Sequence, residues 1–163
     1  MAAPAGAERC VVQSPLGAIT LRLPAGAELV PDPGVSEGTQ LWWDGFTLSF
    51  GAAGGRSADT LLALERSLAT VVAVDTDGTL DAGDGTAVRE LRLGVETRVP
   101  RHWTSDETGR HERSERVERE RLRFRFWSAG DRAVRAGYRV PDGDVARLAV
   151  LDGVLDSVRV GAG

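Results

Sequence analysis

One segment of the sequence has the composition of a phosphate-binding loop. Residues 51–57 read Gly-Ala-Ala-Gly-Gly-Arg-Ser and lie between an expected strand and an expected helix. A glycine-rich loop in that context can hold a phosphate with its backbone amides. The segment is one residue shorter than the P-loop motif, and Arg56 stands where the motif has lysine. We therefore expect a loop that ends in a serine helix cap, with nucleotide or phosphate binding as the alternative.

A second segment has the acidic composition of a calcium loop. Residues 75–85 contain four aspartates and three glycines. If Asp75 were the first ligand of an EF-hand, Leu80 would replace the glycine of its tight turn and Thr86 would replace its bidentate glutamate. Because the turn and the main ligand are both missing, we expect residues 75–86 to form a solvated loop. Weak Ca²⁺ binding is the alternative.

Few other residues could support catalysis or hold a metal. His102 and His111 are expected near the tip of a hairpin, beside Asp106 and Glu112, but an exposed tip offers no pocket for a metal. One cysteine, Cys10, and two histidines cannot supply the roughly four ligands of a structural zinc site. The sequence also contains no G-x-S-x-G motif. We therefore expect no enzyme activity, no metal and no cofactor.

Tryptophan and arginine residues give a stronger indication of partner binding. Trp42 and Trp127 are expected outside the apolar faces of their hairpins, and Trp103 is expected near the tip of the longer hairpin. Arg123 and Arg125 share the face of Trp127. Protein interfaces are enriched in these residue types. We therefore predict that these five residues bind a partner, either on the sheet face that carries four of them or on the hairpin around Trp103. The alternative is that the N-terminal segment or a helix covers them.

The charge of the chain argues against a nucleic-acid partner. Its 20 basic residues are all arginine, and 24 acidic residues give a net charge of −4. Glutamates interrupt the arginines of residues 110–125 and are expected opposite arginines across the strands, whereas a nucleic-acid surface is uniformly basic. The absence of lysine and asparagine is typical of a GC-rich bacterial genome. We expect no contact with nucleic acid.

The sequence shows no sign of a membrane or secretory segment. No apolar run approaches the roughly 20 residues that cross a bilayer. The first residues have neither the basic region nor the apolar stretch of a signal peptide. A single cysteine permits no internal disulfide. We therefore expect a cytoplasmic protein, with residues 1–9 as a flexible tail and residues 10–160 as one domain.

Two hairpins can be placed from their turn residues. Asp44-Gly45 predicts a two-residue turn that sets Trp43 opposite Phe46. A second turn at residues 106–109 pairs Ser105 with Arg110 and fixes the register of a much longer hairpin. In that register the partners on one face are Leu93 with Leu122 and Leu91 with Phe124, and those on the other are Glu90 with Arg125, Glu96 with Arg119 and Val88 with Trp127. Turn chemistry and apolar pairing thus agree on one register.

Further strands and two helices complete the expected order. Alternation predicts strands at residues 19–23 and 133–140, and a short strand near residues 11–12 is an additional candidate. Ser57 caps a helix with Leu61, Leu64 and Leu68 on its buried face. Residues 71–74 either end that helix or begin a strand. A final helix begins near residues 142–144, and its apolar face comprises Val145, Leu148, Leu151, Leu155 and Val158.

This order of elements resembles a known fold. The strand of residues 19–24 ending in Leu-Pro, a hairpin, a helix after a small-residue loop, a long meander and a helix near residues 151–157 are similar to the Mog1/PsbP-like fold. That group includes DcrB-type proteins and the effector chaperones of contractile secretion systems. The resemblance implies a binding or accessory protein and brings no catalytic motif.

We therefore expect one α+β domain with a single antiparallel sheet, a long hairpin meander and two main helices packed on it. The leading functional hypothesis is a non-catalytic protein-binding module. It would act as a cytoplasmic adaptor, chaperone or assembly factor, with a secretion or injection apparatus as one setting. A small-molecule, nucleotide or Ca²⁺-binding domain that uses residues 51–57 or 75–85 is the alternative.

Overall fold

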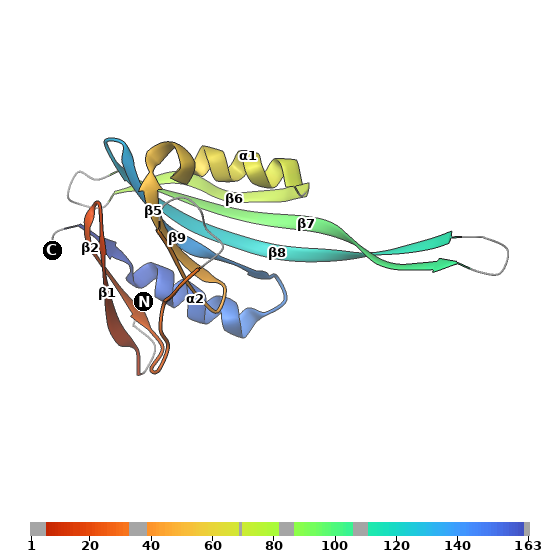
Figure 1. Cartoon of the computed structure of the whole chain (residues 1–163), viewed down its shortest axis with the longest axis horizontal. Coiled ribbons are helices and arrows are strands. Elements are labelled where there is room, and N and C mark those ends of the chain that lie inside the picture. Colours follow the sequence, from red (N-terminus) through yellow and green to blue (C-terminus); the bar gives the residue numbers. More distant parts are fainter. Residues whose placement is uncertain (1–5, 33–38, 69, 82–86, 106–110, 162–163) are drawn as a thin grey trace.

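The described part of the chain folds into two sheets, two α-helices and one short 3₁₀ helix (Figure 1). The computed structural model describes residues 6–32, 39–68, 70–81, 87–105 and 111–161. The strands are β1 (Glu8–Ser14), β2 (Gly17–Leu23), β3 (Val30–Pro31), β4 (Thr39–Trp43), β5 (Phe46–Ala52), β6 (Thr70–Asp81), β7 (Ala87–Ser105), β8 (His111–Ala129), β9 (Arg132–Pro141) and β10 (Arg159–Val160). The helices are η1 (Ala53–Arg56), α1 (Ala58–Leu68) and α2 (Val145–Ser157).

The predicted α+β class is confirmed, but the prediction of a single sheet is wrong. One sheet has the strand order β1-β2-β10, and the other has the order β3-β4-β5-β9-β8-β7-β6. The small sheet depends on a pairing between distant segments, because β10 follows α2 and returns to β2. The alternation of apolar and polar residues within one segment cannot predict such a pairing. β1 begins at Glu8, so Glu8 and Arg9, which were expected in a flexible tail, belong to a strand.

The first predicted hairpin is confirmed in detail. Strands β4 and β5 pair Trp43 with Phe46 and Leu41 with Leu48. The turn residues Asp44 and Gly45 have φ values of 44° and 88°. Two successive positive φ values match the primed turn that an Asp-Gly pair favours.

The long hairpin of β7 and β8 has the predicted register over most of its length. Leu93 pairs with Leu122, and Val88 pairs with Trp127. Toward the tip the register shifts between Pro100 and His102, so that Ser105 pairs with His111 rather than with Arg110. The turn therefore has one more residue than expected, and the irregularity near Pro100 offsets it.

The expectation of a loop over residues 75–86 is wrong for its first half. Residues 70–81 form β6, which pairs with β7 and ends the larger sheet. The pairing shifts between Val71 and Ala73 and again between Val74 and Thr76. These bulges interrupt strict alternation, and the aspartates and glycine that follow are unusual in strands, so residues 75–81 looked like a loop. Residues 82–86 lie outside the described part.

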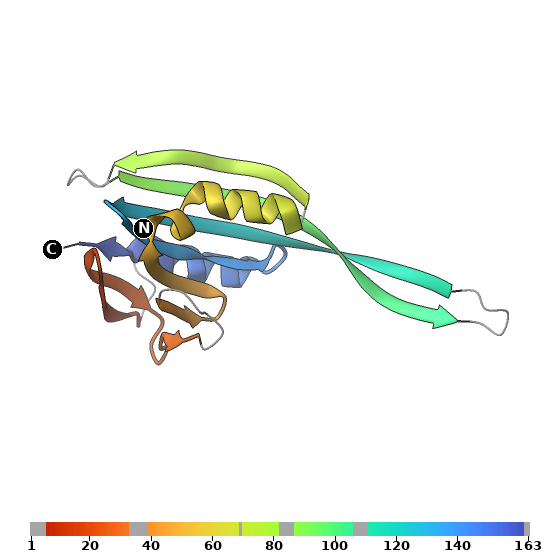
Figure 2. The ribbon, with the colours of Figure 1, turned by 45° about the horizontal axis from the view of Figure 1, so that its top comes forward.

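The larger sheet is covered on both faces. In Figure 2, α1 lies in front of it and α2 behind it. The core beneath α1 comprises Ala58, Leu61, Leu91, Leu93, Val95, Leu122, Phe124 and Phe126. The core on the α2 side combines residues of the sheet with the small sheet and α2, including Phe46, Leu48, Trp127, Val134, Tyr138, Ile19, Leu21, Leu151 and Leu155. On β8, Leu122, Phe124 and Phe126 therefore face the core beneath α1, and Trp127 faces the core on the α2 side.

Both helices begin where the sequence predicts, but on each helix one residue that was expected on the buried face is exposed. The Ser57 hydroxyl accepts a hydrogen bond from the Thr60 amide, and the Asp144 carboxylate accepts one from the Arg147 amide. On α1, Leu64 is exposed and Glu65 is buried in its place. On α2, Val145 is the first residue of the helix and is exposed.

A substitution at Gly137 would test the close packing between β9 and β8. A Cβ atom at this position would overlap the backbone oxygen of Arg123 and the ring of Phe124. We expect Gly137→Ala to lower the free energy of unfolding by on the order of 3 kcal/mol, as measured by urea denaturation. Gly143→Ala is the matched control, because no atom lies within 4 Å of its added Cβ. A Gly137→Ala protein as stable as this control would contradict the packing.

Candidate functional site

A cluster of charged side chains lies between α2 and the larger sheet. Its centre is Arg123 of β8, which is 4% exposed. The Arg123 Nη1 lies 2.9 Å from Asp152 Oδ1, and its Nη2 lies 2.8 Å from Asp156 Oδ1. Its Nε donates to the buried carboxylate of Glu90 on β7. One guanidinium therefore links two strands of the sheet to two successive turns of α2.

Hydrogen bonds to the neighbouring carboxylates keep the Arg123 guanidinium, at the centre of this cluster, positively charged. Burial, the largest influence on Arg123, favours the neutral form, but hydrogen bonds to Glu90, Asp156 and Asp152 outweigh it and raise the pKa of Arg123. The neighbouring Arg125 contributes another contact, because its Nη2 lies 2.8 Å from Asp156 Oδ1. Burial lowers the pKa of Arg125. Neither guanidinium loses its proton near neutral pH, so the cluster orients α2 rather than exchanging protons.

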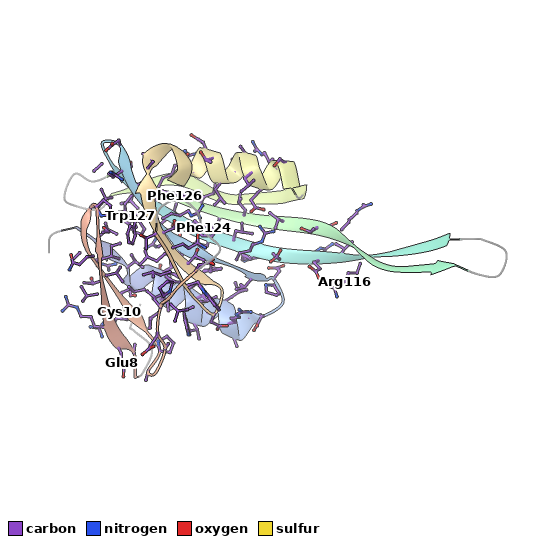
Figure 3. All side chains as sticks on the ribbon, in the orientation of Figure 1. Glu8, Cys10, Arg116, Phe124, Phe126 and Trp127 are labelled. Atoms are coloured by element: carbon purple, nitrogen blue, oxygen red, sulfur yellow. The ribbon has the colours of Figure 1, made fainter. Side chains whose placement is uncertain are left out.

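The expected exposure of Trp127, Arg123 and Arg125 is wrong. Trp127 is only 5% exposed and belongs to the core on the α2 side. Val88 and Val134 are its partners on the two neighbouring strands, and all three lie beneath the helix and the small sheet. The alternative that a helix covers these residues therefore describes the structure. Figure 3 shows Trp127 inside the body of the protein with Phe124 and Phe126.

The residues that complete the cluster were missed in the sequence. Asp152 and Asp156 are four residues apart on α2, beside the buried Leu151 and Leu155. That spacing places both carboxylates on one helix face, next to the apolar stripe, and so indicates a basic partner on the sheet. Tyr138, whose hydroxyl donates to Asp152 Oδ1 over 2.6 Å, is opposite Arg123 on β9. Only the pairing of β9 with β8 could have shown that neighbour.

The other two predicted tryptophans lie far from this cluster in the sheet order. Trp42 on β4 is exposed, as predicted, and pairs with the exposed Val30 of β3 at the edge of the larger sheet. Trp103 is opposite Arg113 near the end of the β7–β8 hairpin. Its side chain lies outside the described part. The structure thus separates the five predicted residues into a buried group, an edge residue and a hairpin residue.

The outer part of the β7–β8 hairpin projects from the body (Figures 1 and 2). Pairing with β6 ends at Glu96, and pairing with β9 ends at Glu120. Beyond these residues lies a two-stranded ribbon that we call the arm, residues 97–105 and 111–118. Arg116 marks it in Figure 3. Within the described residues, neither outer edge of the arm pairs with another strand.

The two candidate binding loops do not have the expected forms. Gly51 and Ala52 are the last residues of β5, whose pairings with β4 and β9 are antiparallel, and residues 53–56 form the short helix η1. The Thr60 hydroxyl donates to the Gly54 carbonyl, and the Ala53 amide donates to the Asp131 carbonyl. The loop is therefore held by contacts within the chain. In the second segment, residues 75–81 belong to β6 rather than to a loop.

No metal site is visible in the part of the chain that the structure describes. No group of three or more potential metal-ligating side chains occurs there. His102 and His111 lie near the end of the hairpin in β7 and β8, and their side chains are outside the described part. Cys10 is half-buried, and burial raises the pKa of its thiol. That shift does not favour the thiolate form that a nucleophile needs.

Comparisons with known proteins assign no family. No model of a protein family matches the chain, and no curated protein matches it. The resemblance to the Mog1/PsbP-like fold therefore stays a prediction. No helix among the described residues is long and apolar enough to cross a membrane.

Tyr138 gives a direct test of the cluster, because it is the only tyrosine of the chain. Burial and the hydrogen bond to Asp152 raise its pKa above the ordinary value of about 10. The unfolded chain therefore loses this proton first, and stability should fall as the pH rises above about 10. We expect the tyrosinate absorbance of the folded protein to appear at higher pH than that of the protein in urea. Equal titration midpoints for the folded protein and the protein in urea would contradict the buried contact. The Tyr138→Phe protein gives the background absorbance.

Proposed function

We propose that the chain is a non-catalytic protein-binding module, an adaptor, chaperone or assembly factor, that holds its partner with the arm. The observation that carries this proposal is the extension of β7 and β8 beyond the strands that flank them. A two-stranded ribbon is only marginally stable by itself in water. Its unpaired edges offer backbone donors and acceptors to an added strand. A partner that pairs with the arm would therefore stabilise it.

The charge of the arm favours a protein over a nucleic acid. Residues 97–118, which comprise the arm and the connection between its two strands, contain five arginines and five acidic residues, so their formal charges cancel. A surface that binds the phosphate backbone needs an excess of cations. Alternating charges of both signs instead suit a protein surface with its own mixed charges, where they select the partner and its register.

The body offers a smaller second contact around Trp42. Trp42 and Val30 are both exposed on neighbouring strands at one edge of the larger sheet. Exposed aromatic residues of this kind are common at protein interfaces. The face of Arg123, Arg125 and Trp127 is not available to a partner, because α2 and the small sheet cover it. We propose a cytoplasmic location, with which the single cysteine agrees, because one cysteine cannot form an internal disulfide.

The alternative of nucleotide or Ca²⁺ binding is less favoured. The antiparallel strand before residues 51–57 differs from the parallel strand that leads into a P-loop. Residues 75–81 form a strand, in which successive side chains point to opposite faces and cannot surround one ion.

A pair of exposed valines allows a matched test of the arm. Val117 on the arm is 49% exposed, and Val150 on α2 is 37% exposed. Each would be replaced in turn by a photo-crosslinking amino acid, and the protein would be irradiated in cells of its host. We expect the Val117 variant to give one dominant crosslink to another protein and the Val150 variant to give none. Identical patterns from both positions, or a product of two copies of this chain, would contradict the adaptor.

A further inference from the structure

A cavity lies beside the charged cluster, where α2 leaves the sheet. Its volume is about 340 Å³, at the lower end of the range for small-molecule sites. Strands β7, β8 and β9 form its floor, and α2 forms one wall. The lining residues are Arg92, Arg121, Leu122, Arg123, Tyr138, Leu148 and Asp152. Three guanidinium groups and a single carboxylate therefore face the same space.

Two of these arginines have hydrogen-bond donors without a partner among the described residues. The Arg92 Nε lies 3.3 Å from Glu90 Oε1, and the Arg121 Nε lies 3.1 Å from Asp142 Oδ1. In both residues the two terminal amino groups have no partner among the residues that the structure describes. Each carboxylate thus fixes its arginine through Nε and leaves the terminal amino groups available. Such a planar pair of donors matches the two oxygens of a carboxylate or a phosphate.

The back of the cavity is fixed. Arg123 uses all three of its nitrogens on Glu90, Asp152 and Asp156. The Tyr138 hydroxyl donates to the same oxygen of Asp152, so two hydrogen bonds hold this carboxylate oxygen in place. Leu148 adds an apolar wall. The side chains that would orient a ligand are therefore in place before it binds, which lowers the entropic cost of binding.

The sheet register explains why these guanidinium groups gather. Arg92 and Arg123 are direct partners on β7 and β8, and like charges in that position repel each other. Glu90 bridges them with one carboxylate oxygen. Arg121 is opposite Gly94, which has no side chain to fill the space above it. The cavity and its positive lining both follow from these positions.

We propose that this cavity binds a small anion, the carboxylate of an organic acid or a phosphate group, between the terminal amino groups of Arg92 and Arg121. The short hydrocarbon part of such a ligand would contact Leu148. The site is separate from the arm and does not depend on the proposed protein-binding function. A ligand here would also contact both the sheet and α2.

Isothermal titration calorimetry with two probes tests the proposal. The probes are inorganic phosphate and glutarate, each titrated into the full chain at low salt. We expect saturable binding of at least one probe at one site per chain. Tighter binding of phosphate would assign a phosphorylated ligand, and tighter binding of glutarate would assign an organic acid. Failure of both probes to bind would overturn the proposal.

Matched variants separate this site from general attraction to arginine. Arg92→Gln and Arg121→Gln each remove one pair of donors, and we expect each to weaken binding roughly tenfold. Arg132→Gln is the control, because Arg132 is 56% exposed and lies outside the cavity, whereas Arg92 and Arg121 are 44% and 48% exposed. All three residues are exposed enough for the variants to fold, which circular dichroism would verify. Equal affinity in the Arg92→Gln, Arg121→Gln and Arg132→Gln proteins would overturn the proposal.

Discussion

The ladder between β7 and β8 is the interaction on which the rest of the structure depends. It pairs residues 87–105 with residues 111–129, whereas β6 and β9 accompany it over only part of that length. Within the body, Leu122, Phe124 and Phe126 of β8 enter the core beneath α1, and Trp127 enters the core on the α2 side. Farther out, the same two strands form the arm. One continuous pairing therefore provides both the centre of the fold and the surface that we propose for binding.

Each helix is tied to this sheet by ion pairs as well as by apolar packing. On one face, the buried Glu65 of α1 accepts a hydrogen bond of 2.6 Å from Arg139 of β9. On the other face, Asp152 and Asp156 of α2 hold Arg123 of β8. Buried ion pairs add little net stability, because desolvation offsets their attraction. They fix one point of contact on each helix, Glu65 of α1 against Arg139, and Asp152 and Asp156 of α2 against Arg123.

The two arrangements have different consequences for function. Beneath α1, the buried charges stand beside a continuous apolar core. Beneath α2, they border a cavity with two arginines whose terminal amino groups have no described partner. The arm begins close to this cavity, because Glu118, at the base of the arm, is three residues from Arg121 along β8. Protein binding at the arm and anion binding at the cavity are nevertheless separate proposals, carried by different residues.

The sequence predicted the features that short-range chemistry determines. Asp44-Gly45 specified its turn, Ser57 specified its cap, and the apolar pairs of β7 and β8 specified their register. The features that it did not predict depend on contacts between distant segments. The return of β10 to β2 made a second sheet, and the cover of α2 and the small sheet buried Trp127. Glu65 could be buried in place of Leu64 only because Arg139 is within reach on β9.

Hydrogen exchange along β8 tests the central claim that one strand serves as both core and unsupported arm. Amides of residues 121–128 lie between two partner strands, whereas those of residues 111–118 have one partner in the described structure. In the isolated protein, we expect the amides of residues 111–118 to exchange faster than those of residues 121–128 by orders of magnitude. Equal protection over both segments would show that the arm is as stable as the body, and would contradict the account.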